Sequence, residues 1–226
     1  MYTDKKPLLY KSITQVINRG SAEILENCDK GIFIKDTVSD VCMLVCDSFE
    51  LSCKWLTKHE GIGYTVLAVF DSDVAGFAAK RYGFSGKLEC YQAVYTHSTA
   101  PEYTSDLIIR EADMTDFEKV SSVYDKITEE ELKQVIGRKE LFIGMRGQEM
   151  AGFAGRHLEG SIGILKVLPQ YRKRGYGKAL ECFMIKYMLD KGLSAFCQVE
   201  THNEISRNLQ LKLGYTVTDE KIYFLY

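Results

Sequence analysis

Two glycines and five basic side chains lie close together in the C-terminal half of the sequence. Gly175 and Gly177 follow an apolar run at 162–167 and precede an amphipathic segment. Glycine lets the backbone turn tightly, so that successive N–H groups can point at one anion. A helix N-terminus adds unpaired N–H groups and partial positive charge. We therefore predict a phosphate-binding turn, and its basic side chains are Lys166, Arg172, Lys173, Arg174 and Lys178.

Several cations in one turn suit a ligand with more than one phosphate, such as a pyrophosphate cofactor. Two common phosphate motifs do not fit this turn. Leu180 stands where the dinucleotide fingerprint needs a third glycine or alanine, and no βαβ unit precedes the turn. No Gly-Lys-Ser/Thr sequence closes a P-loop. The remaining alternative is an ordinary strand-to-helix turn whose basic residues face water.

Arg172, Gly175 and Gly177 match motif A of the GNAT superfamily of N-acetyltransferases, Arg/Gln-x-x-Gly-x-Gly/Ala. A second segment, 203–215, resembles motif B of that family, because it begins with Asn203 and ends in Gly-Tyr. The two motifs occur in the order found in the family. The resemblance covers roughly residues 107–226 and implies an α/β (α+β) GNAT-like fold, with a mixed, mostly antiparallel sheet and flanking helices.

Hydrophobic periodicity predicts elements in the same order as in the resembled family. Thr128 and Glu131 form a capping-box pattern for a short helix, and Gly192 ends a later one. The predicted elements are a strand at 107–110, helices at 117–127 and 129–137, a hairpin of 140–145 and 151–157, a strand at 161–167, a helix to 191, a strand at 195–200, a helix at 203–212 and final strands from 214 onward.

A polar stretch at 96–105 lacks periodicity and predicts a linker. It divides the chain into domain 1–100 and a catalytic domain 106–226. Gly83 aligns with Gly214 when the helix at 72–84 is set on 203–215, which suggests two tandem GNAT-like halves. No Arg-x-x-Gly-x-Gly occurs before residue 100, so we expect the first half to be degenerate and without a cofactor. Chance similarity of two helix-to-strand corners is the alternative.

The resemblance implies acetyl-CoA (coenzyme A) as the cofactor. The pantetheine arm would pair with the backbone of Leu165 and Val167, where family members bulge and expose an amide to the thioester carbonyl. Asn203 would contact the pantetheine or a bound water, although capping its helix explains that residue equally well. The pyrophosphate would be held by Arg172, Lys173, Arg174, Gly175, Tyr176, Gly177 and Lys178. No metal site is predicted.

The acid–base groups match the family less closely. Direct transfer needs an acid that protonates the leaving thiolate. The usual tyrosine is replaced by Gln210, and the substitutes are Tyr215 and Tyr171.

A base must also take a proton from the acceptor ammonium. Ser161 stands at the usual position of a basic glutamate. We expect Glu200, and after it Glu159, to serve instead, and His157 and His202 are also expected near the site. Each of them could equally be a solvated side chain at a strand end.

The missing tyrosine and the additional N-terminal half resemble the glycine N-acyltransferase-like branch of the family. This branch implies an acetyl-CoA-dependent N-acetyltransferase that acts on a primary amine of a small molecule or amino acid. Two other functions remain open. One is an acyl-CoA-binding regulatory or sensor module with weak or no transferase activity, and the other is a structural or interaction domain.

Composition limits the partners and the compartment. A net charge of −2 with mixed signs argues against nucleic acid. No apolar run suits a membrane span or a signal peptide, and the seven cysteines include no C-x-x-C pair, so we expect a cytoplasmic protein with reduced, mostly buried thiols. A homodimer through an apolar edge at Tyr223, Phe224 and Tyr226 and a monomer that buries these rings are both compatible with the sequence.

Overall fold

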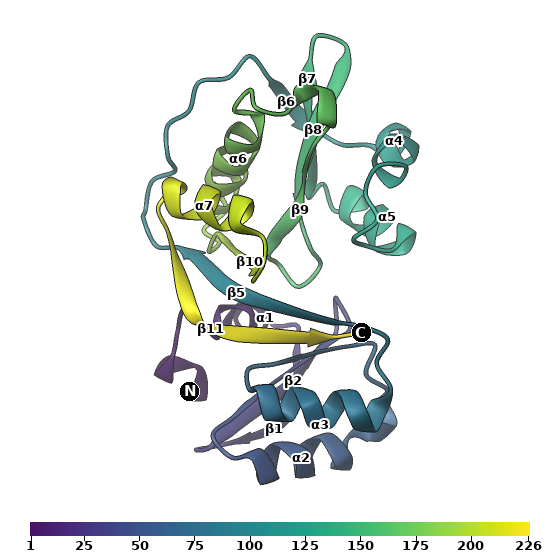
Figure 1. Cartoon of the computed structure of the whole chain (residues 1–226), viewed down its shortest axis with the longest axis vertical. Coiled ribbons are helices and arrows are strands. Elements are labelled where there is room, and N and C mark those ends of the chain that lie inside the picture. The colour runs from purple at the N-terminus through teal and green to yellow at the C-terminus, as the bar shows by residue number, and fades with distance from the viewer. The chain divides into compact units, whose positions relative to one another are not determined.

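The computed structural model describes residues 1–226, which form two compact units (Figure 1). Unit 1 comprises Met1–Ala93, Gln198–Arg207 and Val217–Tyr226, and unit 2 comprises Val94–Cys197 and Asn208–Thr216. The predicted domains 1–100 and 106–226 follow chain order. The compact units differ from them because segments near the C-terminus group with the N-terminal half.

The N-terminal half contains five strands and three α-helices. Its elements are η1 (Tyr2–Lys5), α1 (Lys11–Asn18), β1 (Ala22–Cys28), β2 (Gly31–Asp36), β3 (Val41–Cys46), α2 (Phe49–Lys58), η2 (Glu60–Ile62), β4 (Val66–Val69), α3 (Ser72–Tyr82) and β5 (Lys87–Tyr95). Residues 96–105 contain no helix or strand, as predicted for a linker.

The C-terminal half begins with strand β6 and ends with strand β11. Its elements are β6 (Ile108–Glu111), η3 (Met114–Asp116), α4 (Phe117–Ser121), α5 (Glu129–Gly137), β7 (Leu141–Arg146), β8 (Glu149–Arg156), β9 (Ile162–Val167), η4 (Pro169–Tyr171), α6 (Tyr176–Asp190), β10 (Phe196–Glu200), α7 (Glu204–Leu213) and β11 (Tyr215–Leu225). None of the helices is both long and apolar enough to cross a bilayer.

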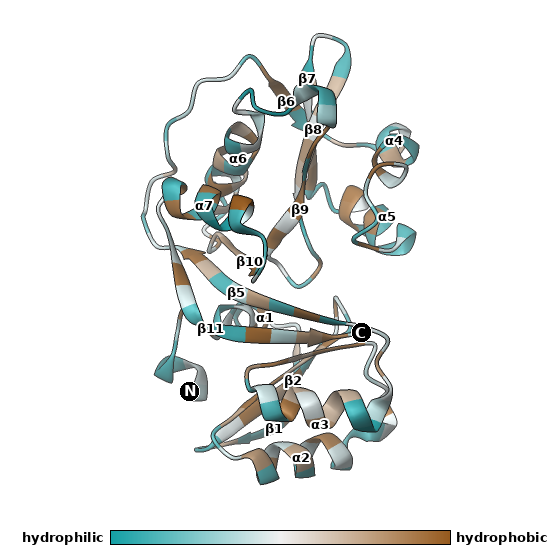
Figure 2. Cartoon of the chain, in the orientation of Figure 1, coloured by the Kyte–Doolittle hydropathy of each residue, from teal (hydrophilic) through white to brown (hydrophobic).

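Unit 1 has a core on each face of its sheet. Successive residues of a strand point to opposite faces. Ile32 and Ile34 accordingly pack with α1, whereas Phe33 packs with α2 and α3. Figure 2 shows brown segments along the strands and alternating brown and teal on α2 and α3, as expected of helices that bury one face.

Unit 2 contains a four-stranded antiparallel sheet in the order β6-β7-β8-β9. Helix α6 covers one face, and α4 and α5 lie on the other (Figure 1). Two glycines allow the close approach of α6, because a Cβ at Gly144 or Gly152 would lie 3.1 or 3.2 Å from the Leu180 methyl groups. On the opposite face, the ring of Tyr124 lies edge-on to Phe153 at 5.5 Å.

Two predicted elements of the C-terminal half differ from the structure. The helix at 117–127 ends at Ser121, because the following residues are held by contacts with β9: Tyr124 donates to the Gly163 carbonyl (3.1 Å) and Lys166 donates to the Val123 carbonyl. The final strands are one continuous strand, β11, since no glycine or proline interrupts 216–224. The predicted N-cap at Thr128 and the helix end at Gly192 are confirmed.

The order βββαβαβ occurs twice, once from β1 to β5 and once from β7 to β11. Helices α3 and α7 are both followed by a glycine with positive φ, 69° at Gly83 and 91° at Gly214. The last strands of the two repeats are exchanged in the sheet order β1-β2-β3-β4-β11-β5-β10. Because β11 pairs with β4 of the first repeat, residues 217–226 belong to unit 1.

This exchange decides between the two alternatives for Tyr223 and Phe224. Strand β11 lies inside the sheet, where Tyr223 pairs with Val69 and Phe224 pairs with Ala68. Phe224 packs on the α1 side of the core and Tyr223 on the α2–α3 side. These rings therefore cover the protein's own core.

The two repeats differ where the third strand of each leads into a helix. In the first repeat, β3 pairs with β4 in parallel, from Val41↔Val66 to Leu44↔Val69. In the second repeat, β9 is an edge strand that pairs only with β8. Only the second repeat therefore has an unpaired strand edge at this position.

The N-terminus of α2 is closed by its own side chain. The Ser48 hydroxyl accepts a hydrogen bond from the Leu51 N–H (3.2 Å), and Asp47 and Glu50 place negative charge beside it. We expect Ser48→Ala to lower the free energy of unfolding by about 1 kcal/mol in urea titrations, since a helix cap is lost. CoA affinity should not change. A weakened CoA affinity with unaltered unfolding would contradict this assignment.

All seven cysteines are free thiols. Four of them are buried, Cys42, Cys90, Cys182 and Cys197. Burial raises the pKa of the Cys182 thiol to about 11 and that of Cys90 to about 12. Cys90 and Cys182 are therefore protonated and unreactive at neutral pH.

Candidate active site

The loop between β9 and α6 holds the predicted phosphate-binding turn. Lys173 and Gly175 both have positive φ, 61° and 81°. Gly175 is the N-cap of α6, and no side chain caps the first turn. The N–H groups at the start of α6 therefore remain available, in contrast to those of α2.

Two buried aromatic side chains anchor this loop to the body of unit 2. Tyr171 and Tyr176 are buried with Ala151, and the Tyr171 hydroxyl donates to Glu149. The Arg174 guanidinium lies over the Tyr171 ring at 5.7 Å from its centroid. The predicted contribution of Tyr176 to a cofactor is thus limited to its backbone, since its side chain is buried.

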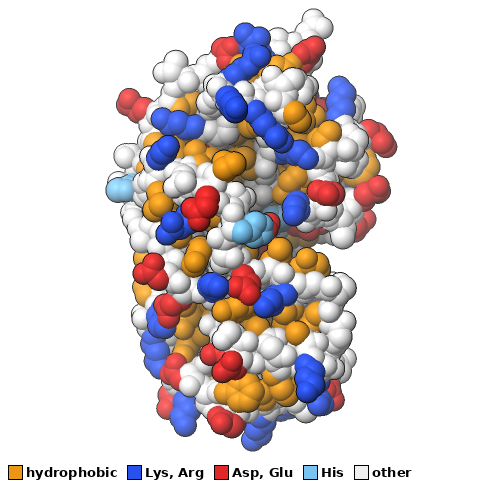
Figure 3. All heavy atoms as spheres, in the orientation of Figure 1, with side chains coloured by type: hydrophobic (Ala, Val, Ile, Leu, Met, Phe, Trp, Pro, Cys, Tyr) orange, Lys and Arg blue, Asp and Glu red, His pale blue; other side chains and the backbone are white.

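The outer side of the loop is open and basic. A Cβ at Gly175 would meet no atom within 4 Å, and one at Gly177 would meet only Val167 Cγ2 at 3.8 Å. Arg172, Lys173, Arg174 and Lys178 are exposed. Figure 3 shows Lys and Arg side chains gathered on the visible face of unit 2. The loop thus combines space, backbone donors and positive charge, which a pyrophosphate requires.

Strand β9 carries its bulge at Gly163. Ile164 pairs with Gly155 and Ile162 pairs with Arg156, so Gly163 is the additional residue. The predicted bulge at Leu165 and Val167 is wrong, because both residues keep regular register with β8. A Cβ on residue 163 would lie 2.4 Å from His157 Cδ2, so the His157 ring packs directly against the glycine backbone.

Charged side chains gather around this bulge. His157 Nδ1 lies 3.0 Å from Glu131 Oε1, and the Ser161 hydroxyl donates to Glu159. His157 and Glu159 were expected near the site, whereas the capping-box pattern indicated only a helix-capping role for Glu131. The Glu131 N–H does bond to Thr128 (3.1 Å), whereas the carboxylate turns to His157.

The pKa of His157 reflects two opposing effects. Burial lowers it, but the hydrogen bond to Glu131 and the charges of Glu159 and Glu131 outweigh burial, and the net shift of the pKa is upward. The imidazole is consequently stabilised as a cation by two carboxylates.

Two predicted site residues belong to unit 1, whereas the loop and the bulge belong to unit 2. Glu200 Oε2 lies 3.1 Å from His202 Nε2, and the His202 side chain is 80% exposed. Asn203 Oδ1 accepts a hydrogen bond from the Ser206 N–H (3.0 Å), which is the helix-capping role given as its alternative. The functional roles of Glu200 and Asn203 stay predictions.

Tyr215 and Gln210 form a buried cluster with Glu181 of α6. The Tyr215 hydroxyl donates to Glu181 Oε1 at 2.9 Å, and Gln210 also hydrogen-bonds to that carboxylate. Burial raises the pKa of Glu181 to about 7 despite both bonds, and burial also raises that of Tyr215. The Tyr215 proton is thus directed at Glu181, which argues against Tyr215 as the acid for a leaving thiolate.

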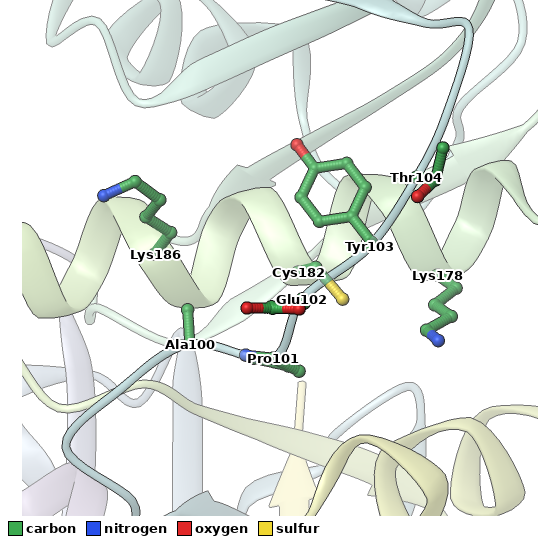
Figure 4. Close-up of a pocket in the computed structure, with 8 residues that line it drawn as sticks. All are labelled: Ala100, Pro101, Glu102, Tyr103, Thr104, Lys178, Cys182 and Lys186. Carbon is green, nitrogen blue, oxygen red and sulfur yellow. The ribbon is translucent and has the colours of Figure 1, made fainter.

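A groove of about 660 Å³ lies between the linker and α6. Figure 4 shows the Tyr103 ring over α6, with Lys178 and Lys186 extending from the helix at the two ends of the groove. Lys178 belongs to both the loop and the groove. The lining residues are Ala100, Pro101, Glu102, Tyr103, Thr104, Lys178, Cys182 and Lys186.

Residues 141–224 match the family model of FR47-like proteins. A Drosophila protein of solved structure is similar in fold over 99% of this chain and 92% of its own, with a TM-score of 0.73 and 16% identity. A GCN5-related N-acetyltransferase-like protein from Streptococcus suis is similar over 99% and 98%, with a TM-score of 0.60 and 15% identity.

A tandem GNAT protein from the clavulanic acid biosynthesis pathway is also similar, over 99% of this chain and 95% of its own, with a TM-score of 0.52 and 11% identity. Among curated protein sequences there is no significant match. The second repeat thus matches the FR47-like family model, and the chain as a whole has the fold of GNAT structures.

Proposed function

We propose that this protein is an acetyl-CoA-dependent N-acetyltransferase whose acceptor is a primary amine of a small molecule or amino acid. The observation that carries the proposal is the uncapped N-terminus of α6 in a basic loop beside the unpaired edge of β9. The first repeat has neither feature, since Ser48 caps α2 and β3 is paired with β4. One cofactor site, in the second repeat, follows from this difference.

The residues of the loop fit the pyrophosphate of coenzyme A. Backbone N–H groups of 172–178 would bind its oxygens, with the Arg172 and Arg174 side chains as further partners. Leu165 and Val167 would offer backbone groups to the pantetheine arm. When bound, acetyl-CoA supplies the activated thioester, whereas the protein positions it and moves protons.

The surroundings of the bulge favour a cationic acceptor. A pocket of about 390 Å³ between α4 and α5 is lined by Glu118, Asp125 and Glu129, among other residues, and by Tyr124. Negative charge in its lining would attract an ammonium group. Together with Gln210 and the tandem halves, this supports an acceptor like that of the glycine N-acyltransferase-like branch.

An acyl-CoA-binding regulatory or sensor module is the second candidate. The hydroxyl protons of both candidate acids are already used in hydrogen bonds, since Tyr215 donates to Glu181 and Tyr171 donates to Glu149. This observation favours the second candidate. A thiolate that leaves without a proton donor would slow transfer. Thiol release from acetyl-CoA in the presence of a panel of amines separates the two candidates.

The test of the proposal starts with calorimetry and thermal unfolding in the presence of acetyl-CoA, CoA and dephospho-CoA. Micromolar binding that raises the melting temperature would support the cofactor. Release of free CoA that depends on an added amine would then support transfer. Absence of any binding by the intact protein would refute the acetyltransferase and the sensor alike.

The groove beside α6 provides a finer prediction. We expect it to receive the adenosine end of CoA, with Tyr103 against the base and Lys186 near the 3′-phosphate. Calorimetry should then show Lys186→Gln to weaken CoA binding about fivefold, corresponding to about 1 kcal/mol, without affecting dephospho-CoA. Lys191→Gln is the matched control, since Lys191 lies over the Tyr187 ring at 4.5 Å and outside the groove. Equal losses for both ligands would contradict this placement.

A further inference from the structure

The bulge of β9 lies against an imidazole that is held by a carboxylate. His157 Nδ1 is 3.0 Å from Glu131 Oε1, and the two side chains are 24% and 26% exposed. A Cβ on Gly163 would lie 2.5 Å from His157 Nε2. Glu131 thus engages one ring nitrogen, while the other lies directly beside the backbone of the bulge.

Elements from three parts of unit 2 form this arrangement. Glu131 comes from α5, His157 from the turn after β8, and Gly163 from β9. Tyr124, from the segment between α4 and α5, donates to the Gly163 carbonyl at 3.1 Å and also lines the acidic pocket. The imidazole therefore lies next to the place where the proposed acceptor would arrive.

A purely structural pair is the alternative, and the chain contains one for comparison. His59 Nε2 lies 2.7 Å from Glu26 Oε1 in unit 1, beside a register shift of β1 between Ile24 and Glu26. That pair joins the end of α2 to β1. His157 differs from His59 because its second nitrogen borders a glycine that is itself exposed at the sheet edge.

We propose that His157, oriented by Glu131, is the general base of the acyl transfer. This inference rests on the proposed function. Nε2 takes one proton from the acceptor ammonium, and the nitrogen electron pair forms the new C–N bond with the thioester carbonyl carbon. The C–S bond breaks and its electrons remain on sulfur. The attacking nitrogen gives its second proton to the thiolate, and the proton held by His157 passes to water.

Neighbouring charges set the expected pH dependence. Glu131 and Glu159 both raise the pKa of His157. Tyr124 faces the same bulge, and Arg156 at the end of β8 is paired with Glu140 at 2.8 Å. Only the neutral imidazole can accept a proton, so the rate should increase as the pH rises through this elevated pKa.

The test combines a pH profile with a titration of the free protein. His157→Gln should lower kcat/KM about 100-fold and remove the inflection on the acidic side of the profile, while the CoA affinity measured by calorimetry stays unchanged. Glu131→Gln should shift that inflection to lower pH. In NMR titrations without any ligand, the His157 ring should titrate at a lower pH in Glu131→Gln than in the natural protein.

His59→Gln is the matched control and should leave the rate and the profile unaltered. Full activity and an unchanged inflection in His157→Gln would overturn the inference, even though CoA still binds. The inference would also be overturned if the pKa of His157 measured by NMR were the same in Glu131→Gln as in the natural protein. This second measurement does not require an active variant. Failure of the natural protein to bind CoA would instead refute the proposed function itself.

Discussion

Gly175→Asp combined with Arg172→Ala is expected to reduce CoA affinity at least about 100-fold. Gly175 has a φ of 81°, so an aspartate there would strain the loop or rearrange it. Its carboxylate would also repel the pyrophosphate at the start of α6, and the second change removes a charged donor. Together these effects amount to about 3 kcal/mol or more, which corresponds to the stated loss.

Calorimetry with CoA measures this effect, and a second glycine provides the control. Gly192 follows α6 at its other end, has a φ of 68°, and has no atom near the position of a Cβ. Gly192→Asp introduces the same residue in a similar backbone conformation but far along the helix from the loop. If Gly192→Asp lost as much CoA affinity as the double variant, the loss would reflect a damaged fold and not a phosphate site.

Glu181→Gln is expected to remove a strong pH dependence of stability. Burial raises the pKa of Glu181 to about 7 from an ordinary value of 4.5. Between these two values the folded chain keeps a proton that the unfolded chain releases, so stability falls as the pH rises through this window. At 1.36 kcal/mol per pH unit, the decrease is about 3 kcal/mol by pH 8.

Glutamine cannot ionise and preserves the shape of the cluster. Its amide oxygen can still accept from Tyr215, and its amide nitrogen can donate to Gln210 Oε1, which is buried without a partner. Glu181→Gln should therefore match the natural protein at pH 5 and exceed its stability at pH 8.

Urea unfolding at pH 5 and pH 8 measures this difference. Glu118→Gln, which changes an exposed carboxyl in the same unit, serves as the control and should leave the pH dependence in place. If Glu181→Gln were less stable than the natural protein at pH 8, the carboxylate would be a stabilising anion, and the assignment of a raised pKa would be wrong.

Local sequence signals predicted the second repeat well. The spacing of apolar residues, the cap at Thr128 and the stop at Gly192 are local features, and they hold in the structure. The loop of 172–178 was also visible, because a pair of glycines and clustered cations are adjacent in sequence. The repeat was indicated by Gly83 and Gly214, which end equivalent helices with positive φ.

Contacts between distant residues could not be predicted in this way. The position of the bulge depends on the pairing of Gly155 with Ile164, and the partner of Glu131 depends on how α5 packs beside the turn at His157. The strand exchange is also non-local, because nothing in the sequence of β11 indicates that its partner is β4.

The sequence by itself therefore determined the family resemblance, the phosphate-binding loop and the repeated order of elements, because each depends on residues that are neighbours along the chain. Tertiary structure decided the position of the bulge, the acid–base neighbours of His157, the buried environment of Glu181 and the exchange of the last strands. Each of these results from pairing and packing between segments far apart in the sequence, whose free energies depend on burial and geometry that no local pattern encodes.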